Sequence, residues 1–240
     1  MISLDRMNQI DEIRPDARIA IVGAGVILST LHDAVDAHDL IFPMTFGAKG
    51  SATIGGMLST NAGGSNVLRY GNTRDLCLGI EAVLPNGEII NLMSELHKDN
   101  SGLNLKHLLI GAEGTLGLIT RAVLKLSPKP RAYATAMVGA QTLGGGLTLL
   151  NTLQEATGGA VEAFEYMPQA YIKAHLDMFK TAKAPFDNPH PANFLIEVGA
   201  TAPHDCAIQS DGSIPVVTQL ETSLAALLET NDIQDAVVAQ

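Results

Sequence analysis

The sequence predicts an α+β fold, because strand-like and helix-like patterns alternate along it. An apolar run at 19–22 is followed, after Gly25, by apolar residues at helical spacing. Alternating apolar residues from 76 to 84 lead into Asn86-Gly87, a dipeptide typical of the tight turn of a β-hairpin. These patterns predict short strands joined by helices and hairpins.

The first helix follows a strand directly. Ile27, Leu31, Ala34 and Val35 fall at positions i, i+4, i+7 and i+8, which places them on one helical face. A short apolar helix at 105–110 and a β-rich strand at 119–126 complete this first region. We expect one core to bury all of these apolar faces.

Pro128 and Pro130 follow the last of these strands, and prolines remove backbone donors from a sheet. We therefore expect a domain boundary here, with one domain at 1–132 and another at 133–240. Ser213 is expected to cap a helix with Pro215 in its first turn. The expected elements of the second region are a strand at 133–138, a helix at 142–155, a strand at 161–164, a loop at 183–192, a helix with Val217, Leu220, Leu224, Leu227 and Leu228 on one face, and a strand-like end at 235–240.

Composition limits the possible functions. The 240 residues are 46% hydrophobic and carry a formal net charge of −10, which argues against a nucleic-acid partner. No apolar run approaches the roughly 20 residues of a membrane helix, and the start of the chain carries acidic residues, unlike a signal peptide. Cys77 and Cys206 form neither a metal motif nor a disulfide framework. We expect a cytoplasmic protein without a transmembrane segment.

The most unusual segment is the glycine-rich segment, residues 47–66, in which small residues dominate. Such a segment lets backbone N–H groups approach a bulky polar ligand, while its hydroxyl and amide side chains add hydrogen bonds. A flexible loop is the alternative, but Ile54, Met57 and Leu58 are interleaved as in a packed segment. The residue pattern leaves both interpretations open.

Two better-known phosphate motifs fit poorly. A Walker loop requires Ser or Thr after its lysine, whereas Lys49 precedes Gly50. Gly23 and Gly25 follow a strand and open a helix, as in a Rossmann fingerprint, but Leu28 takes the place of the third glycine. An NAD-binding protein using these two glycines stays open as an alternative.

A second cluster of small residues, residues 111–117, lies between the expected helix at 105–110 and the following strand. It is either a second backbone wall for the same ligand or a helix C-cap followed by a tight turn. The histidines form no HxH or HExxH pair, and no Gly-x-Ser-x-Gly motif is present. We therefore predict no metal ligand and assign no catalytic residue.

Several ordered motifs add a resemblance to a known family. They are Thr53-Ile-Gly-Gly-Met-Leu-Ser-Thr-Asn-Ala-Gly-Gly64, Arg69-Tyr-Gly-Asn-Thr-Arg-Asp75, Val83-Leu-Pro-Asn-Gly87, Lys98-Asp-Asn-Ser-Gly102 and Gly111-Ala-Glu-Gly-Thr-Leu-Gly-Leu-Ile-Thr120. In this order they resemble the FAD-linked oxidases of the PCMH, or vanillyl-alcohol-oxidase-like, group. Within it the chain looks most like the D-2-hydroxy-acid dehydrogenases, which include the glycolate oxidase FAD subunit, D-lactate dehydrogenase and D-2-hydroxyglutarate dehydrogenase.

The resemblance implies the C-terminal half of a PCMH-type FAD-binding domain, followed by part of an α/β substrate (cap) domain. It implies FAD-dependent oxidation of a small 2-hydroxy acid (glycolate, D-lactate or D-2-hydroxyglutarate) to the 2-keto acid. A quinone, another flavoprotein or a cytochrome would accept the electrons. The residues implied to line FAD are Gly47, Gly50, Ser51, Thr53, Gly55, Gly56, Thr60, Asn61, Ala62, Gly63, Gly64, Glu113, Gly114, Thr115, Gly117, Leu118 and Ile119.

The chain also departs from the family pattern. The family's glycine-rich pyrophosphate loop and its C-terminal His-rich metal motif have no counterpart in these residues, so the resemblance implies truncation at both ends. Leu103 replaces a usual tyrosine and Ser101 a usual threonine. We expect these 240 residues to be inactive on their own. The alternative is a non-catalytic remnant or partner module that binds no flavin.

Overall fold

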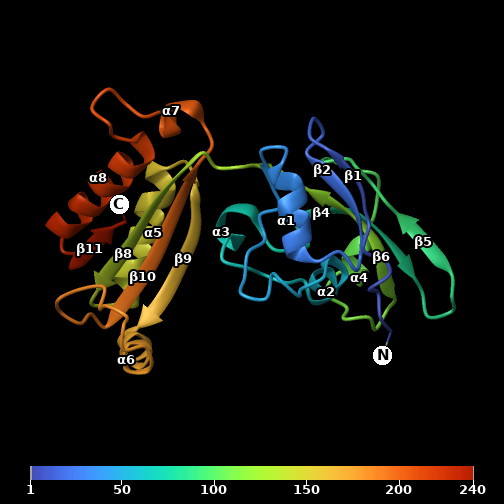
Figure 1. The fold of residues 1–240 in the computed structure, drawn as a ribbon, viewed down its shortest axis with the longest axis horizontal. Helices are drawn as coiled ribbons and strands as arrows, with labels where there is room; N and C mark the ends of the chain where they lie inside the picture. The colour runs from blue at the N-terminus through green and yellow to red at the C-terminus, as the bar shows by residue number, and fades with distance from the viewer. Residues whose placement is uncertain (1, 240) are drawn as a thin grey trace. The chain divides into compact units, whose positions relative to one another are not determined.

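The computed structural model describes residues 2–239, which form two compact units. Unit 1 is Met1–Lys129 and unit 2 is Pro130–Gln240. Both units combine antiparallel sheets with helices, which confirms the predicted α+β class (Figure 1). Each unit has its own hydrophobic core, so each is described by itself.

Unit 1 contains a five-stranded antiparallel sheet in the order β1-β2-β6-β4-β5. The predicted hairpin joins β4 to β5, with Gly87 at a φ of 86°. The two-residue strands β3 and β7 pair with each other in a separate, smaller sheet. Pro128, which we expected to end the sheet, belongs to β7 in this second sheet. The bounds are β1 Ile10–Arg14, β2 Ile19–Gly23, β3 Leu40–Ile41, β4 Cys77–Val83, β5 Ile89–Leu92, β6 Leu118–Lys125 and β7 Ser127–Pro128.

The helices of unit 1 are α1 Leu28–Asp36, α2 Ile54–Thr60, α3 Val67–Tyr70 and α4 Lys106–Leu109. Helix α1 buries Leu31 and Val35, as its apolar spacing predicts, whereas Ile27 precedes the helix and is partly exposed. Helix α2 buries Ile54, Met57 and Leu58 in the same core. The apolar residues interleaved in the glycine-rich segment are thus packing residues.

Unit 2 contains an antiparallel sheet in the order β11-β8-β10-β9, with α5 and α8 side by side on one face (Figure 1). Alternate residues of β8, Ala134, Ala136 and Val138, are buried beneath these helices. The strand-like end of the chain pairs with β8 as β11. The bounds are β8 Ala132–Ala140, α5 Leu143–Ala156, β9 Val161–Pro168, α6 Gln169–Met178, β10 Ala192–Ala200, α7 Pro203–Cys206, α8 Pro215–Glu229 and β11 Asp235–Val238.

The predicted cap of the last helix is wrong. Helix α8 begins at Pro215 with Ile214 as its N-cap, and the Ser213 hydroxyl donates to Asp211 Oδ1 at 2.7 Å. The buried stripe includes Val216 in place of the expected Val217, and Leu228 at the end of the expected stripe is 37% exposed. The position at which a helix begins decides which of its residues face the sheet. The sequence pattern placed the N-cap of this helix at Ser213, one residue before its position in the structure.

The structure also removes the Rossmann alternative. The sheet that contains β2 is antiparallel, whereas a dinucleotide fold requires parallel strands. A Cβ at Gly23 would lie 2.1 Å from the Met7 carbonyl oxygen, and one at Gly25 would lie 2.1 Å from that of Leu4. Glycine is therefore required at both positions because the N-terminal segment packs against them. That segment occupies the space that a pyrophosphate would need.

Acidic pH should destabilise unit 1 through His32. Its Nε2 lies 3.1 Å from the Phe42 carbonyl oxygen, and burial lowers the pKa of His32 below its usual 6.5. Below that pH the unfolded chain takes up a proton that the folded protein binds more weakly, so stability falls as the pH decreases. We expect a lower urea midpoint at pH 5.5 than at pH 7.5, and a smaller difference in His32→Gln. An equal difference in the variant would contradict this assignment.

Candidate functional site

The centre of the glycine-rich segment is helix α2, which the sequence did not predict. Thr53 caps its start, because Thr53 Oγ1 accepts a hydrogen bond from the Gly56 N–H at 3.2 Å. Asn61 closes its end with a φ of 47°, in the left-handed region that asparagine tolerates. The segment is therefore an ordered cap-helix-cap unit and not a flexible loop.

The second cluster lies against the C-terminal end of α2. The Gly111 N–H donates to the Leu58 carbonyl oxygen at 2.9 Å, and the Glu113 N–H donates to that of Ser59 at 3.0 Å. The last carbonyls of a helix lack partners within the helix, so this cluster satisfies two of them. The structure thus brings together the two segments that the sequence assigned to one ligand.

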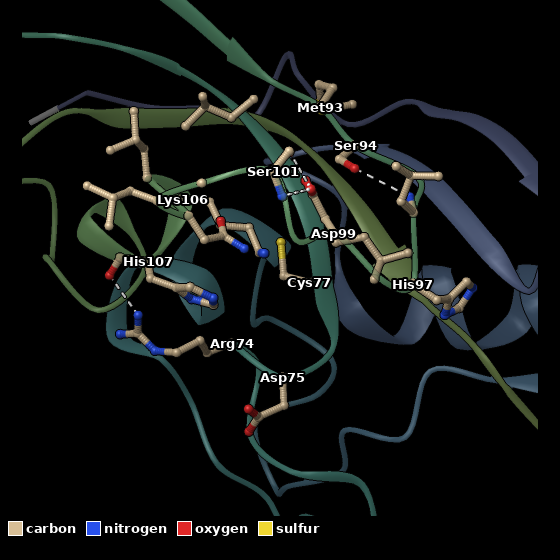
Figure 2. Close-up of a pocket in the computed structure, with 17 residues that line it drawn as sticks. Arg74, Asp75, Cys77, Met93, Ser94, His97, Asp99, Ser101, Lys106 and His107 are labelled. Carbon is tan, nitrogen blue, oxygen red and sulfur yellow. Dashed lines mark hydrogen bonds between the residues drawn. The ribbon is translucent and has the colours of Figure 1, made fainter.

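Arg74 links the same segments. Its backbone N–H donates to Asn61 Oδ1 at 3.0 Å. Its guanidinium donates to the His107 carbonyl oxygen at 2.7 Å (Figure 2) and also to the Ile110 carbonyl oxygen. A Cβ at Gly111 would lie 2.9 Å from Arg74 Nη2, and Gly111 has a φ of 85°. Glycine is therefore needed here for packing as well as for backbone conformation.

Some of the predicted flavin residues are glycines because the protein itself approaches them. A Cβ at Gly55 would lie 2.7 Å from the Ala24 Cβ, and one at Gly64 would lie 2.4 Å from the Thr45 carbonyl oxygen. A Cβ at Gly117 would lie 2.9 Å from the Val83 carbonyl oxygen. Packing alone explains these three positions.

Other glycines of the set face open space. Nothing lies within 4 Å of a Cβ built at Gly47 or Gly50, and a Cβ at Gly56 would meet only Thr53 Oγ1, at 3.1 Å. Gly63 is exposed, with only a Val67 methyl group 3.4 Å from its Cβ position. No internal contact requires glycine at these positions, so they are where a ligand would gain from a bare backbone. The exposed residues of the set are Gly47, Gly50, Ser51, Gly56, Thr60, Gly63, Glu113, Gly114 and Thr115.

The hydrogen-bonding groups of this face suit a dinucleotide. Within residues 2–239, the consecutive N–H groups of Gly63 and Gly64 have no hydrogen-bond acceptor, which leaves two backbone donors for an anionic group such as a phosphate. The Thr60 and Thr115 hydroxyls donate to the Gly56 and Ala112 carbonyl oxygens. Their lone pairs are left to accept from ribose or ring N–H groups. The residues present therefore fit part of an FAD site.

Sequence reasoning named Arg74 only as part of a motif and gave it no role. Three of its hydrogen bonds reach residues 13 to 36 positions away in the chain, so local patterns carry no sign of them. Within residues 2–239 the structure shows no helix that could cross a membrane. It also shows no group of three or more metal-ligating side chains in that range.

Comparison with known proteins shows which proteins this chain resembles. Residues 1–93 match the FAD binding domain family. Two named dehydrogenases are similar over longer stretches. The chain is 36% identical over 209 residues to a mitochondrial D-2-hydroxyglutarate dehydrogenase of Bos taurus, a match that covers 85% of this chain and 38% of the relative. It is 47% identical over 131 residues to a D-lactate dehydrogenase of Archaeoglobus fulgidus, covering 55% of this chain and 29% of that protein.

Solved structures agree on the fold. The structure of p-cresol methylhydroxylase with substrate bound matches with a TM-score of 0.67 and 17% identity, covering 98% of this chain and 48% of that one. The FAD binding domain match and the named dehydrogenases confirm the resemblance to FAD-linked enzymes, and the domain match supports FAD as the cofactor. The chain spans 38–42% of the length of the D-2-hydroxyglutarate enzymes that it matches at 36% identity.

Replacing Arg74 by methionine should destabilise unit 1. The His107 and Ile110 carbonyl oxygens would lose a charged donor, and hydrogen bonds to charged groups contribute about 1.5–3 kcal/mol. We expect the free energy of unfolding, measured in urea, to fall by about 2 kcal/mol. Arg6→Met removes an exposed arginine and should leave it unchanged. Equal stabilities of the two variants would show that Arg74 does not hold these segments.

Proposed function

We propose that this chain is part of an FAD-dependent dehydrogenase that oxidises a D-2-hydroxy acid to the 2-keto acid. Residues 1–132 would contribute to the flavin-binding domain, and residues 133–240 to the substrate domain. Flavin supplies the hydride acceptor in such a reaction. The residues of this chain would bind and orient FAD. The Gly63 and Gly64 N–H groups would donate to its phosphates, and Gly56, Thr60 and Thr115 would contact the remainder of the cofactor.

One observation carries the proposal. The N–H groups of Gly111 and Glu113 bond to the last carbonyls of α2, so the glycine-rich segment and the second cluster form one continuous surface. Each cluster alone has a structural explanation as a turn or a cap. Their direct contact, together with open glycines and unpaired backbone donors on the same surface, supports a single extended ligand such as a dinucleotide.

Match length does not separate the candidate substrates. A D-2-hydroxyglutarate enzyme matches over 85% of this chain, and a putative D-lactate dehydrogenase of Schizosaccharomyces pombe matches over 100%. Both matches include residues of unit 2, so D-2-hydroxyglutarate and D-lactate are both proposed as substrates, with glycolate as a further alternative. We propose a quinone, a flavoprotein or a cytochrome as electron acceptor, and a cytoplasmic location. The bovine relative's name places it in mitochondria, which leaves this location to be tested by fractionation.

The alternative function is a partner module that binds no flavin. Titrating the 240-residue chain with FAD, monitored by the quenching of flavin fluorescence, separates the two. Saturable binding supports the flavin site, and its absence at millimolar FAD supports the module. Relatives extend well beyond the matched region, so we propose that these 240 residues bind FAD weakly and turn over no hydroxy acid alone. Heat-sensitive reduction of a dye by D-2-hydroxyglutarate with this chain alone would contradict that part.

Substitution at Gly56 should weaken FAD binding and leave the fold intact. Gly56→Val places methyl groups on the open face of α2, where only Thr53 Oγ1 is near, and ligand atoms would be displaced. We expect a dissociation constant at least about tenfold higher, measured by the same titration. Gly144→Val is the matched control, because Gly144 lies in the first turn of α5 with only Thr142 Oγ1 near its Cβ position. Equal FAD affinity in both variants would remove Gly56 from the site.

Gly64→Val should instead disrupt unit 1, because its side chain would clash with the Thr45 backbone. A lowered urea midpoint or loss of the cooperative transition would show this. Gly145→Val cannot replace Gly144→Val as a control, since its Cβ would lie 2.5 Å from the Asp232 carbonyl oxygen. A stably folded Gly64→Val variant would contradict the assignment of Gly64 to packing.

A further inference from the structure

Unit 1 contains a cavity of about 490 Å³ apart from the candidate flavin surface (Figure 2). It lies between the β4–β5 hairpin and the loop that leads into α4, and its lining includes Cys77, Leu96, Leu103 and Lys106. None of the residues assigned to FAD lines it. Its volume falls in the range of small-molecule sites, roughly 300–1,000 Å³.

Lys106 lines this cavity while being only 8% exposed. Among residues 2–239, no hydrogen bond and no ion pair joins its ammonium group to another residue. The Lys106 ammonium is nevertheless not one of the solvent-inaccessible polar atoms that lack a partner, so it is open to the cavity. Lysines are mostly exposed, so a largely buried lysine stem that presents its charge to a cavity favours an anionic ligand.

No neighbouring group within residues 2–239 forms a contact ion pair with Lys106. Asp99 acts on it at longer range. Asp99 Oδ1 accepts hydrogen bonds from the Ser101 hydroxyl at 2.5 Å and the Ser101 N–H at 2.9 Å, and these bonds, together with the nearby Lys106 ammonium, lower the pKa of Asp99. Burial raises the pKa of the Cys77 thiol to about 12, so it stays neutral. Burial and the nearby cations Lys106 and Arg74 lower the pKa of His107.

Asp75 is the remaining acid in the lining, and its Oδ2 accepts the Asn72 N–H at 2.9 Å. It also forms no ion pair with Lys106, whereas the Arg74 guanidinium adds a second positive charge to the wall. Within residues 2–239 the cavity thus presents a lysine ammonium without a contact ion pair, while its two acids accept hydrogen bonds from backbone N–H groups and from the Ser101 hydroxyl. A negatively charged ligand would pair with this ammonium.

Three exposed leucines lie among the mostly polar residues that line the cavity. Leu96, Leu103 and Leu105 have exposed fractions of 63%, 92% and 47%. Leucines this exposed, gathered around one cavity, would gain by contact with an apolar body. A cation and three exposed leucines in one cavity are complementary to an amphiphilic anion.

We propose that this cavity binds an organic oxyanion, a carboxylate or a phosphate, whose charged group pairs with the Lys106 ammonium and whose apolar part contacts Leu96, Leu103 and Leu105. The site is separate from the flavin surface and does not depend on the proposed dehydrogenase activity. Arg74 lies in its wall and also donates hydrogen bonds to the His107 and Ile110 carbonyl oxygens, so it connects the cavity to the segment that precedes the second cluster.

Calorimetric titration of the full 240-residue chain tests the site with three probes: octanoate, inorganic phosphate and octanol. Octanoate carries both features of the expected ligand, phosphate only the charge, and octanol only the apolar body. Lys106→Met removes the charge at similar length, and Lys106→Arg keeps it. Lys98→Met is the matched control, because Lys98 is exposed in the same loop and does not line the cavity.

We expect saturable octanoate binding that weakens at least about tenfold in Lys106→Met and persists in Lys106→Arg and Lys98→Met. A cooperative thermal transition of Lys106→Met without ligand, measured in the same experiment, shows that the variant is folded. Phosphate binding without octanoate binding would identify a plain oxyanion and still support the site. Octanoate or phosphate binding unchanged in Lys106→Met, or no saturable binding of either to the original chain at 10 mM, would overturn the proposal.

Discussion

The hydrogen bonds of Arg74 hold together the segments on which the binding surfaces of unit 1 depend. Its backbone engages the residue that ends α2, while its guanidinium engages the carbonyls that precede the second cluster. Because carbonyl oxygens do not neutralise a guanidinium, its positive charge is retained close to both surfaces. A single side chain thus couples the position of the glycine-rich segment to that of the cavity wall.

The glycines of this surface serve two separable purposes. Gly55, Gly64 and Gly117 admit close approach of the protein's own backbone or side chains, whereas Gly47, Gly50 and Gly56 meet little or nothing. A glycine-rich motif therefore contains glycines that are needed for packing and glycines that leave space for a ligand. The distinction decides which substitutions report on a cofactor and which only unfold the chain.

The sequence predicted the elements whose signal is local. The hairpin at Asn86-Gly87 and the α1 stripe follow from turn chemistry and periodicity, and the helix expected at 142–155 is α5, whereas the one predicted cap, Ser213, is wrong. The sequence did not predict α2, because glycines and β-branched residues disfavour a helix that tertiary contacts impose. It also could not reveal the hydrogen bonds of Arg74 or the absence of a contact ion pair at Lys106, since both depend on contacts between distant segments. The family motifs indicated the candidate flavin residues, but only the fold showed which of them are exposed.

Hydrogen exchange measured with and without millimolar FAD tests most directly whether the glycine-rich segment and the second cluster form one flavin-binding surface. The backbone amides of Gly63 and Gly64, which lack acceptors within residues 2–239, should become protected together with amides of residues 111–117. Strands β9 and β10 of unit 2 serve as the internal reference. Protection of only one segment, or protection of neither at saturating FAD, would contradict the shared surface.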